Sequence, residues 1–163
     1  MVKTGQIVIA SEQVTLTRLR NVCIAVWRHT PVAGQIKAVH RLADELEARY
    51  PRKTALANVV IGGRPSFPEE VRKEALALMG ADGLFNLGTA HVILIDSFGG
   101  ATTRAFLSSL ILLARPKEPN KVFAHLDPAL TWLAQSLMRT PEHGWSREAL
   151  ASAVGDAMSG AAD

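Results

Sequence analysis

The sequence predicts an α/β fold: a mixed, largely parallel sheet with an opening β-hairpin and helices packed on it. Short β-branched runs alternate with segments of helical periodicity along most of the chain. Two of these runs, 22–27 and 91–95, are apolar on both faces, as expected of parallel strands covered on both sides. A length of 163 residues suits one domain whose core closes without metal or disulfide support.

The first third of the chain predicts a hairpin, an interior strand and a helix. Residues 6–10 and 14–19 read as strands, and Arg20-Asn21 as the turn into the third strand, 22–27. Thr30-Pro31 ends that strand. An apolar stripe then predicts a helix over 33–49, which Pro51 terminates.

A second strand and helix pair is predicted next. Residues 55–61 read as a buried strand that runs into Gly62-Gly63. Ser66 with Glu69 matches a capping box and Pro68 suits the first turn, so a helix is expected to follow as far as about Met79. Residues 84–88 fit either a short strand or a packed loop.

The stretch 90–116 predicts the central strand, turn and helix. The strand covers 91–95, and Gly99-Gly100 permits a tight turn with a positive φ. The helix is expected from Thr102 or Thr103 onward. Its run 106–113 is apolar nearly all round, which predicts a second buried face, covered either by the C-terminal helix or by another subunit. We favour a homodimer.

The last part predicts a strand over 121–126 and a helix with Asp127 as N-cap and Pro128 at its first position. Ser146 is expected to cap a further helix. We expect residues 1–140 to form the α/β domain, and residues 141–163 to form a C-terminal helix and tail packed on it or extending from it.

Composition and charge narrow the classes of function. The net charge of +3 arises from scattered, mixed charges, so we expect no nucleic-acid partner. The single Cys23 reads as a small core hydrophobe, which favours a reducing compartment. No signal-peptide pattern and no apolar run of bilayer length are seen, so we expect a cytoplasmic protein without a membrane span.

The sequence contains no complete motif that indicates catalysis. The five histidines show no metal-ligand spacing, and His91 and His125 read as hydrogen-bonded residues at apolar strands. Ser97 follows a strand but lacks the first glycine of a nucleophile elbow. We therefore expect no catalytic residue, metal or cofactor, and no enzyme.

The turn after the central strand is the candidate contact site for a protein partner or a small anionic ligand. Carboxyl ends of strands are where open α/β sheets place ligands, and a helix N-terminus attracts anions. The alternative is that Asp96 simply caps the helix. The candidate residues are Asp96, Ser97, Gly99, Gly100, Thr102, Thr103 and Arg104.

The whole succession of elements resembles the STAS-like family, which includes the SpoIIAA-like anti-sigma-factor antagonists. The resemblance covers residues 6–138, and it is carried most by KVFAHLDPALTWLAQSL, similar to the family's final strand, acid, and helix with a Trp-Leu pair. It implies a non-catalytic signalling domain that binds partner proteins.

The resemblance also implies, in some members, a phosphorylated Ser or Thr at a helix N-terminus. The family's Asp-Ser-Ser/Thr-Gly is matched in letters only by 96–99, where Phe98 replaces the hydroxyl. By order of elements the equivalent turn follows Ile61, where Ser66 is the available hydroxyl. Ser66 is thus either a phosphorylation site or an ordinary N-cap.

Overall fold

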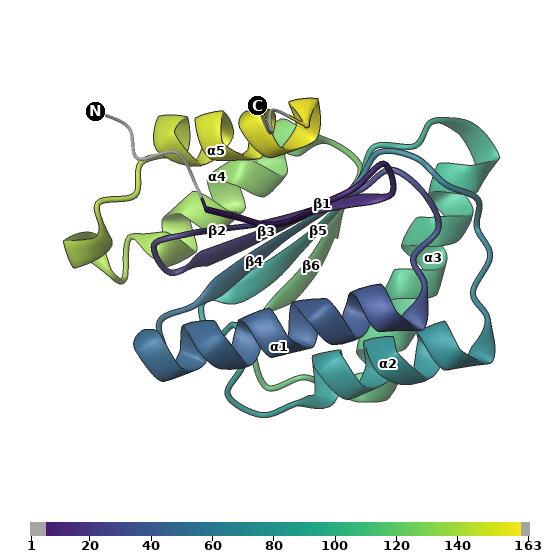
Figure 1. Ribbon diagram of the computed structural model, residues 1–163, viewed down its shortest axis with the longest axis horizontal. Helices are drawn as coiled ribbons and strands as arrows, with labels where there is room; N and C mark the ends of the chain where they lie inside the picture. Colours follow the sequence, from purple (N-terminus) through teal and green to yellow (C-terminus); the bar gives the residue numbers. More distant parts are fainter. Residues whose placement is uncertain (1–5, 161–163) are drawn as a thin grey trace.

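A computed structural model describes residues 6–160 as an α/β structure, six strands with helices on both faces of the sheet (Figure 1), as the sequence predicts. The strands are β1 (Gln6–Ala10), β2 (Val14–Leu19), β3 (Val22–Trp27), β4 (Ala55–Val60), β5 (Gly88–Ile93) and β6 (Asn120–Phe123). The α-helices are α1 (Ala33–Arg49), α2 (Glu69–Gly80), α3 (Ser97–Ala114), α4 (Leu126–Leu137) and α5 (Arg147–Ser159).

The sheet is mixed and its strands lie in sequence order, β1-β2-β3-β4-β5-β6. The first three pair antiparallel, and β3 to β6 pair parallel. The predicted bounds of β1, β2, β3 and α1 are confirmed to the residue. Proline and turn residues frame each of these elements, so local chemistry alone sets their ends.

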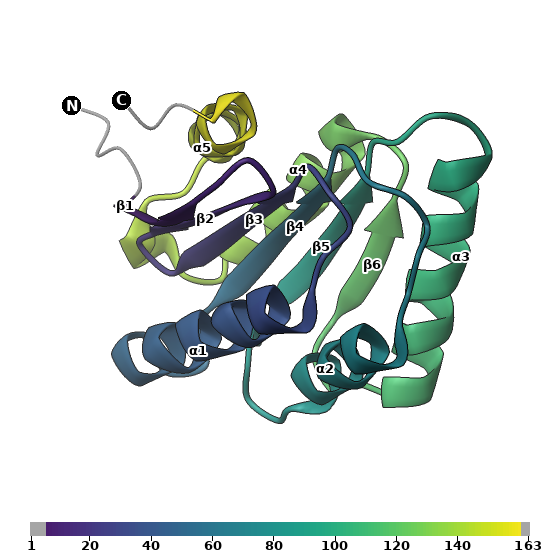
Figure 2. The same ribbon diagram turned by 45° about the vertical axis from the view of Figure 1, so that its right-hand side comes forward.

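Each parallel strand pair is joined by one helix. Such connections share one handedness, so neighbours joined in sequence order place their helices on the same face of the sheet. Figures 1 and 2 show α1, α2 and α3 on one face and α4 and α5 on the other. We call these the α1–α3 face and the α4/α5 face.

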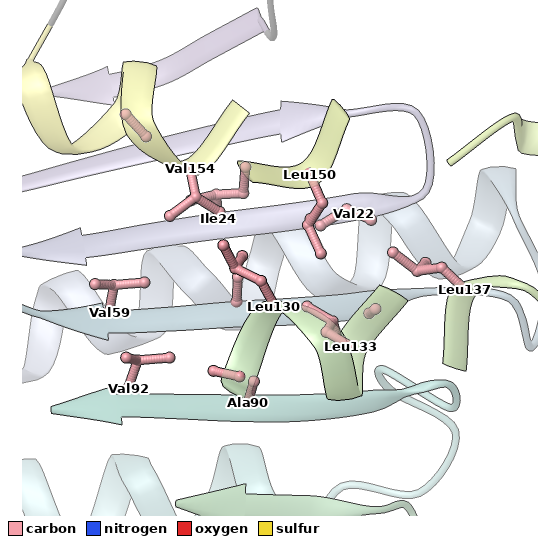
Figure 3. Close-up of a cluster of buried hydrophobic side chains, with 14 of the residues drawn as sticks. Val22, Ile24, Val59, Ala90, Val92, Leu130, Leu133, Leu137, Leu150 and Val154 are labelled. Atoms are coloured by element: carbon pink, nitrogen blue, oxygen red, sulfur yellow. The ribbon is translucent and has the colours of Figure 1, made fainter. Parts of the chain in front are cut away.

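The α4/α5 face carries a packed core of aliphatic side chains (Figure 3). Sheet residues interdigitate there with Leu130 and Leu133 of α4 and with Leu150 and Val154 of α5, all at most 4% exposed. The sheet's contribution consists of Val22, Ile24, Val26, Ala55, Ala57, Val59, Ala90, Val92 and Phe123.

On the α1–α3 face, α1 covers β2 and β3 with a second apolar cluster. Cys23 lies in it at 0% exposure, which confirms its expected role as a small core residue. Burial raises the pKa of the Cys23 thiol to about 12, so the thiol stays protonated in the folded protein.

The N-terminus of α2 corrects the capping prediction. Pro68, not Ser66, occupies the N-cap position, with φ −56° and ψ 157°. A residue before proline is sterically excluded from the helical region, so Phe67 cannot belong to a helix that includes Pro68. Ser66 instead lies exposed in the preceding loop, where its amide donates to the Arg64 carbonyl.

The start of α3 was predicted five residues too late. The helix begins at Ser97 with Asp96 at the N-cap, so Gly99 and Gly100 lie inside its first turns and neither has a positive φ. Gly100 serves a different purpose: a Cβ there would lie 1.9 Å from the Ile95 carbonyl oxygen. The glycine lets the helix backbone approach the end of the sheet.

Three other bounds shift by a few residues. The central strand β5 starts three residues and ends two residues earlier than predicted, and residues 84–87 form a packed loop whose Leu84, Phe85 and Leu87 are buried. The strand β6 ends at Phe123, and α4 starts at Leu126 with His125 as its N-cap. Asp127 and Pro128 therefore lie within the first turn of α4, where a missing amide proton costs little.

The C-terminal segment folds back over the opening hairpin. Trp145 donates from Nε1 to Asn21 Oδ1 at 2.8 Å, and the Ser146 hydroxyl caps α5 by accepting from the Ala149 amide, as predicted. The helix α5 contacts α4, β2 and β3. It therefore does not cover α3, which lies across the sheet (Figure 2).

No helix within residues 6–160 combines the length and the apolar character that crossing a membrane requires.

Candidate functional site

The structure places the predicted contact residues along the first two turns of α3. Asp96 is exposed and makes no side-chain hydrogen bond to the helix it precedes. The hydroxyls of Thr102 and Thr103 donate to the carbonyls of Phe98 and Gly99, each at 2.9 Å. Both hydroxyls are thus engaged by the helix backbone itself.

The other candidates in this segment have distinct surroundings. Gly100 and Thr103 are buried, Gly99 and Arg104 are half-buried, and the side chain of Ser97 lies outside the described part of the structure. The nearest heavy atom to a Cβ built on Gly99 is 3.8 Å away, so that glycine is not sterically required.

The outward side of α3 carries three large apolar side chains that are exposed. Phe98, Leu112 and Leu113 are 84%, 77% and 72% exposed. Small residues lie between them, and Arg104 is the only charged residue in the helix. We define the α3 face as the exposed residues Phe98, Ala101, Ala105, Ser108, Ser109, Leu112 and Leu113.

A cavity of about 130 Å³ lies beneath the helices on the α1–α3 face. Its floor is the sheet, and its roof consists of apolar side chains of α1, α2 and α3, among them Ala75 and Leu78 of α2. At the carboxyl ends of the strands its lining includes Thr30, Gly62 and Arg64. The cavity thus reaches the edge of the sheet where ligands bind in open α/β folds.

A row of four polar side chains crosses the cavity floor, one from each of β3, β4, β5 and β6. Trp27 Nε1 donates to Asn58 Oδ1 at 2.6 Å, and Asn58 Nδ2 lies 3.0 Å from His91 Nδ1. His91 Nε2 lies 3.0 Å from Asn120 Oδ1, and Asn120 Nδ2 donates to the Glu118 carbonyl at 3.2 Å. We call Trp27, Asn58, His91 and Asn120 the polar row.

The indole at one end fixes the direction of every hydrogen bond in the row. An indole N–H can only donate, so Asn58 must present its oxygen to Trp27 and its amide nitrogen to His91. His91 Nδ1 is therefore the acceptor, and Nε2 carries the proton that Asn120 Oδ1 accepts. The arrangement requires a neutral imidazole.

The environment of His91 favours the same protonation state. Its side chain is 3% exposed, and burial lowers the pKa of the imidazole below its ordinary value of 6.5. The hydrogen bond to Asn120 opposes this shift without overcoming it. His91 is thus the hydrogen-bonded histidine that the sequence predicts, whereas His125 is exposed.

None of the four members of the polar row was among the predicted contact residues, and His91 was predicted only as a hydrogen-bonded histidine; Trp27, Asn58 and Asn120 were not singled out at all. A usable signal existed for one of them, because Asn58 interrupts an otherwise apolar buried strand, ALANVV. A buried polar group needs a partner, so it should have been paired with His91, which interrupts the next strand. Trp27 and Asn120 stand at strand ends, where neither side chain is unusual.

Within residues 6–160, no three His, Cys, Asp or Glu side chains gather as ligands for a metal ion would. Comparisons with protein-family models, curated proteins and solved structures return no match to this chain.

Proposed function

We propose that this chain is a non-catalytic protein-interaction module of STAS-like type, and that it associates with a second copy of itself through the α3 face. The single observation that carries the proposal is the exposure of Phe98, Leu112 and Leu113 on one helix. A continuous apolar surface of this kind marks an interaction site in soluble proteins.

The position of α5 favours another subunit as the partner of the α3 face, because α5 itself does not cover that face. The sequence left both choices open, and α5 packs on the opposite side of the sheet, against α4, β2 and β3. Within the described residues no other helix lies outside α3 (Figure 2). The described helices therefore leave the α3 face open to another molecule.

The composition of the α3 face suits a copy of itself. Ala101, Ala105 and Ser108 lie between the large apolar residues and allow two helices to approach closely. The face carries no charge, so two copies bury no unpaired ion and meet no like-charge repulsion. An isologous pair is the commonest arrangement for such a self-complementary patch.

Sedimentation velocity from low to high micromolar concentration tests this proposal. The wild-type chain is expected to dimerise, and Leu112→Glu is expected to weaken the dimer at least about tenfold, because it buries a charge in the interface. Met138→Glu is the matched control, since Met138 is 71% exposed but ends α4 on the opposite face. A wild-type monomer at high micromolar concentration would reject self-association, and equal loss in both variants would reject the α3 face as the interface.

A further inference from the structure

The polar row lines the cavity and retains unused hydrogen-bonding capacity. A carboxamide offers two N–H donors and two oxygen lone pairs. Within the row, Asn58 uses one N–H and one lone pair, and so does Asn120. Each carboxamide can therefore still donate one hydrogen bond and accept one.

These two carboxamides are also accessible. Asn58 and Asn120 lie on the α1–α3 face of the sheet, and both are half-buried. The packed α4/α5 face differs, because its sheet residues Ile24, Val59 and Val92 are at most 2% exposed. Both asparagines line the cavity.

The size of the cavity limits what it can hold. A dry apolar cavity of about 150 Å³ in another protein holds a benzene molecule, and this one measures about 130 Å³. About one six-membered ring is therefore the upper range of a rigid guest. The largely aliphatic and aromatic roof suits such a ring.

The charges of the lining lie at its two ends. Arg64 is exposed and follows β4, and Glu118 precedes β6, where its carboxylate accepts from the Gly83 amide at 3.0 Å. Between these ends the polar groups are neutral, including the imidazole of His91. A charged guest would find no counter-ion inside, and its desolvation would go uncompensated.

We propose that the cavity is a binding site for an uncharged, single-ring molecule bearing one hydroxyl or carbonyl group, which hydrogen-bonds to either Asn58 or Asn120 while the ring packs beneath α2. This site is separate from the α3 face, so the binding proposal can be tested independently of dimerisation. At the carboxyl ends of β3 and β4, Thr30 and Arg64 line the cavity, and the Thr30 hydroxyl links their two loops by hydrogen bonds to the Arg64 backbone at 3.0 Å.

Phenol and toluene, which have nearly the same shape, test the site by titration calorimetry on the full chain. A dry apolar cavity would bind phenol about tenfold or more weakly than toluene, since burying an unpaired hydroxyl is costly. With the polar row as partner, phenol is expected to bind at least as tightly as toluene and to compete with it. It should also shift the side-chain amide NMR signals of Asn58 or Asn120.

A matched pair of variants locates the guest. Ala75 lines the cavity, so Ala75→Leu fills it and should weaken phenol binding at least about tenfold while keeping or raising the melting temperature. Ala77→Leu makes the same change on the exposed side of α2 and should leave binding unaltered. Should Ala75→Leu fail to fold, Leu78→Phe fills the same space from the next turn.

Three results would overturn the proposal: no binding of either compound at millimolar concentration, toluene binding with phenol at least tenfold weaker, or full phenol binding by the folded Ala75→Leu variant.

Discussion

The two faces of one sheet are built by different rules. On the α4/α5 face, neighbouring strands present Ile24, Val59 and Val92, and the helices fill the space between them with leucines (Figure 3). All of these side chains are apolar and nearly inaccessible. This face resembles an ordinary close-packed interior, in which dispersion contacts and burial supply the stability.

On the α1–α3 face, the residues one position earlier on β4 and β5 are Asn58 and His91. They hydrogen-bond to each other and to Trp27 and Asn120, and a cavity lies above them. The strands are the same, so on the sheet side the difference lies in which alternate residues are polar. A buried polar row of this kind is tolerated only because each member has a partner.

The largest expected difference between the two faces is the loss of stability when one leucine on each face is truncated. Leu133→Ala on α4 is expected to lower the free energy of unfolding by about 2–5 kcal/mol, because Leu133 is 1% exposed and fully packed. Leu78→Ala on α2 should cost less than half as much, because Leu78 is half-buried and already borders the cavity. Urea denaturation measures both. Equal costs would mean that the α1–α3 face is as tightly packed as the other.

The two glycines of α3 test how the helix is fixed to the edge of the cavity. Gly100→Ala is expected to destabilise the fold by about 1–3 kcal/mol, since its Cβ would overlap the Ile95 carbonyl oxygen and push α3 outward. Gly99→Ala, one residue away, meets only ordinary contacts and should be neutral or stabilising by up to about 1 kcal/mol, as alanine favours helices. Thermal unfolding of the two variants compares them, and a stable Gly100→Ala would refute the close approach.

The neutral imidazole in the row predicts an acid sensitivity that the apolar face cannot have. The pKa of His91 is lowered in the folded protein, so near and below pH 6.5 the unfolded state binds a proton that the folded state does not. Stability should therefore fall as the pH falls through about 6.5, with a slope approaching ~1.4 kcal/mol per pH unit from this residue.

Urea denaturation between about pH 8 and pH 5 measures that slope. His91→Gln should reduce it, whereas His29→Gln, at an exposed position, should not. Indistinguishable slopes for the wild type and His91→Gln would show that His91 is protonated in the folded state without penalty.

Elements with local signals at both ends were predictable from the sequence. The strands β1 to β3 and the helix α1 match to the residue, because alternation, the Arg20-Asn21 turn and two prolines, Pro31 and Pro51, define them without reference to the rest of the chain. The error at α3 has the opposite origin. Gly100 resembles a turn residue, and only its contact with Ile95 in three dimensions explains a glycine within the helix.

The candidate site was harder to predict for the same reason. Pairing Asn58 with His91 needs only the parallel register of β4 and β5, so the centre of the polar row could be predicted from two strands. The cavity above it could not, because its volume depends on how side chains from three helices share one space. The exposure of α3 also required the fold, since it depends on where α5 packs.

Xenon binding in a pressurised crystal tests the contrast between the two faces most directly, because xenon enters empty apolar cavities without needing a specific contact. The predicted result is a xenon atom between the polar row and α2, near Ala75 and Leu78, and none among the described side chains of the α4/α5 face. Xenon between α4 and the sheet, or a side chain filling the space above Asn58 and His91, would contradict the account.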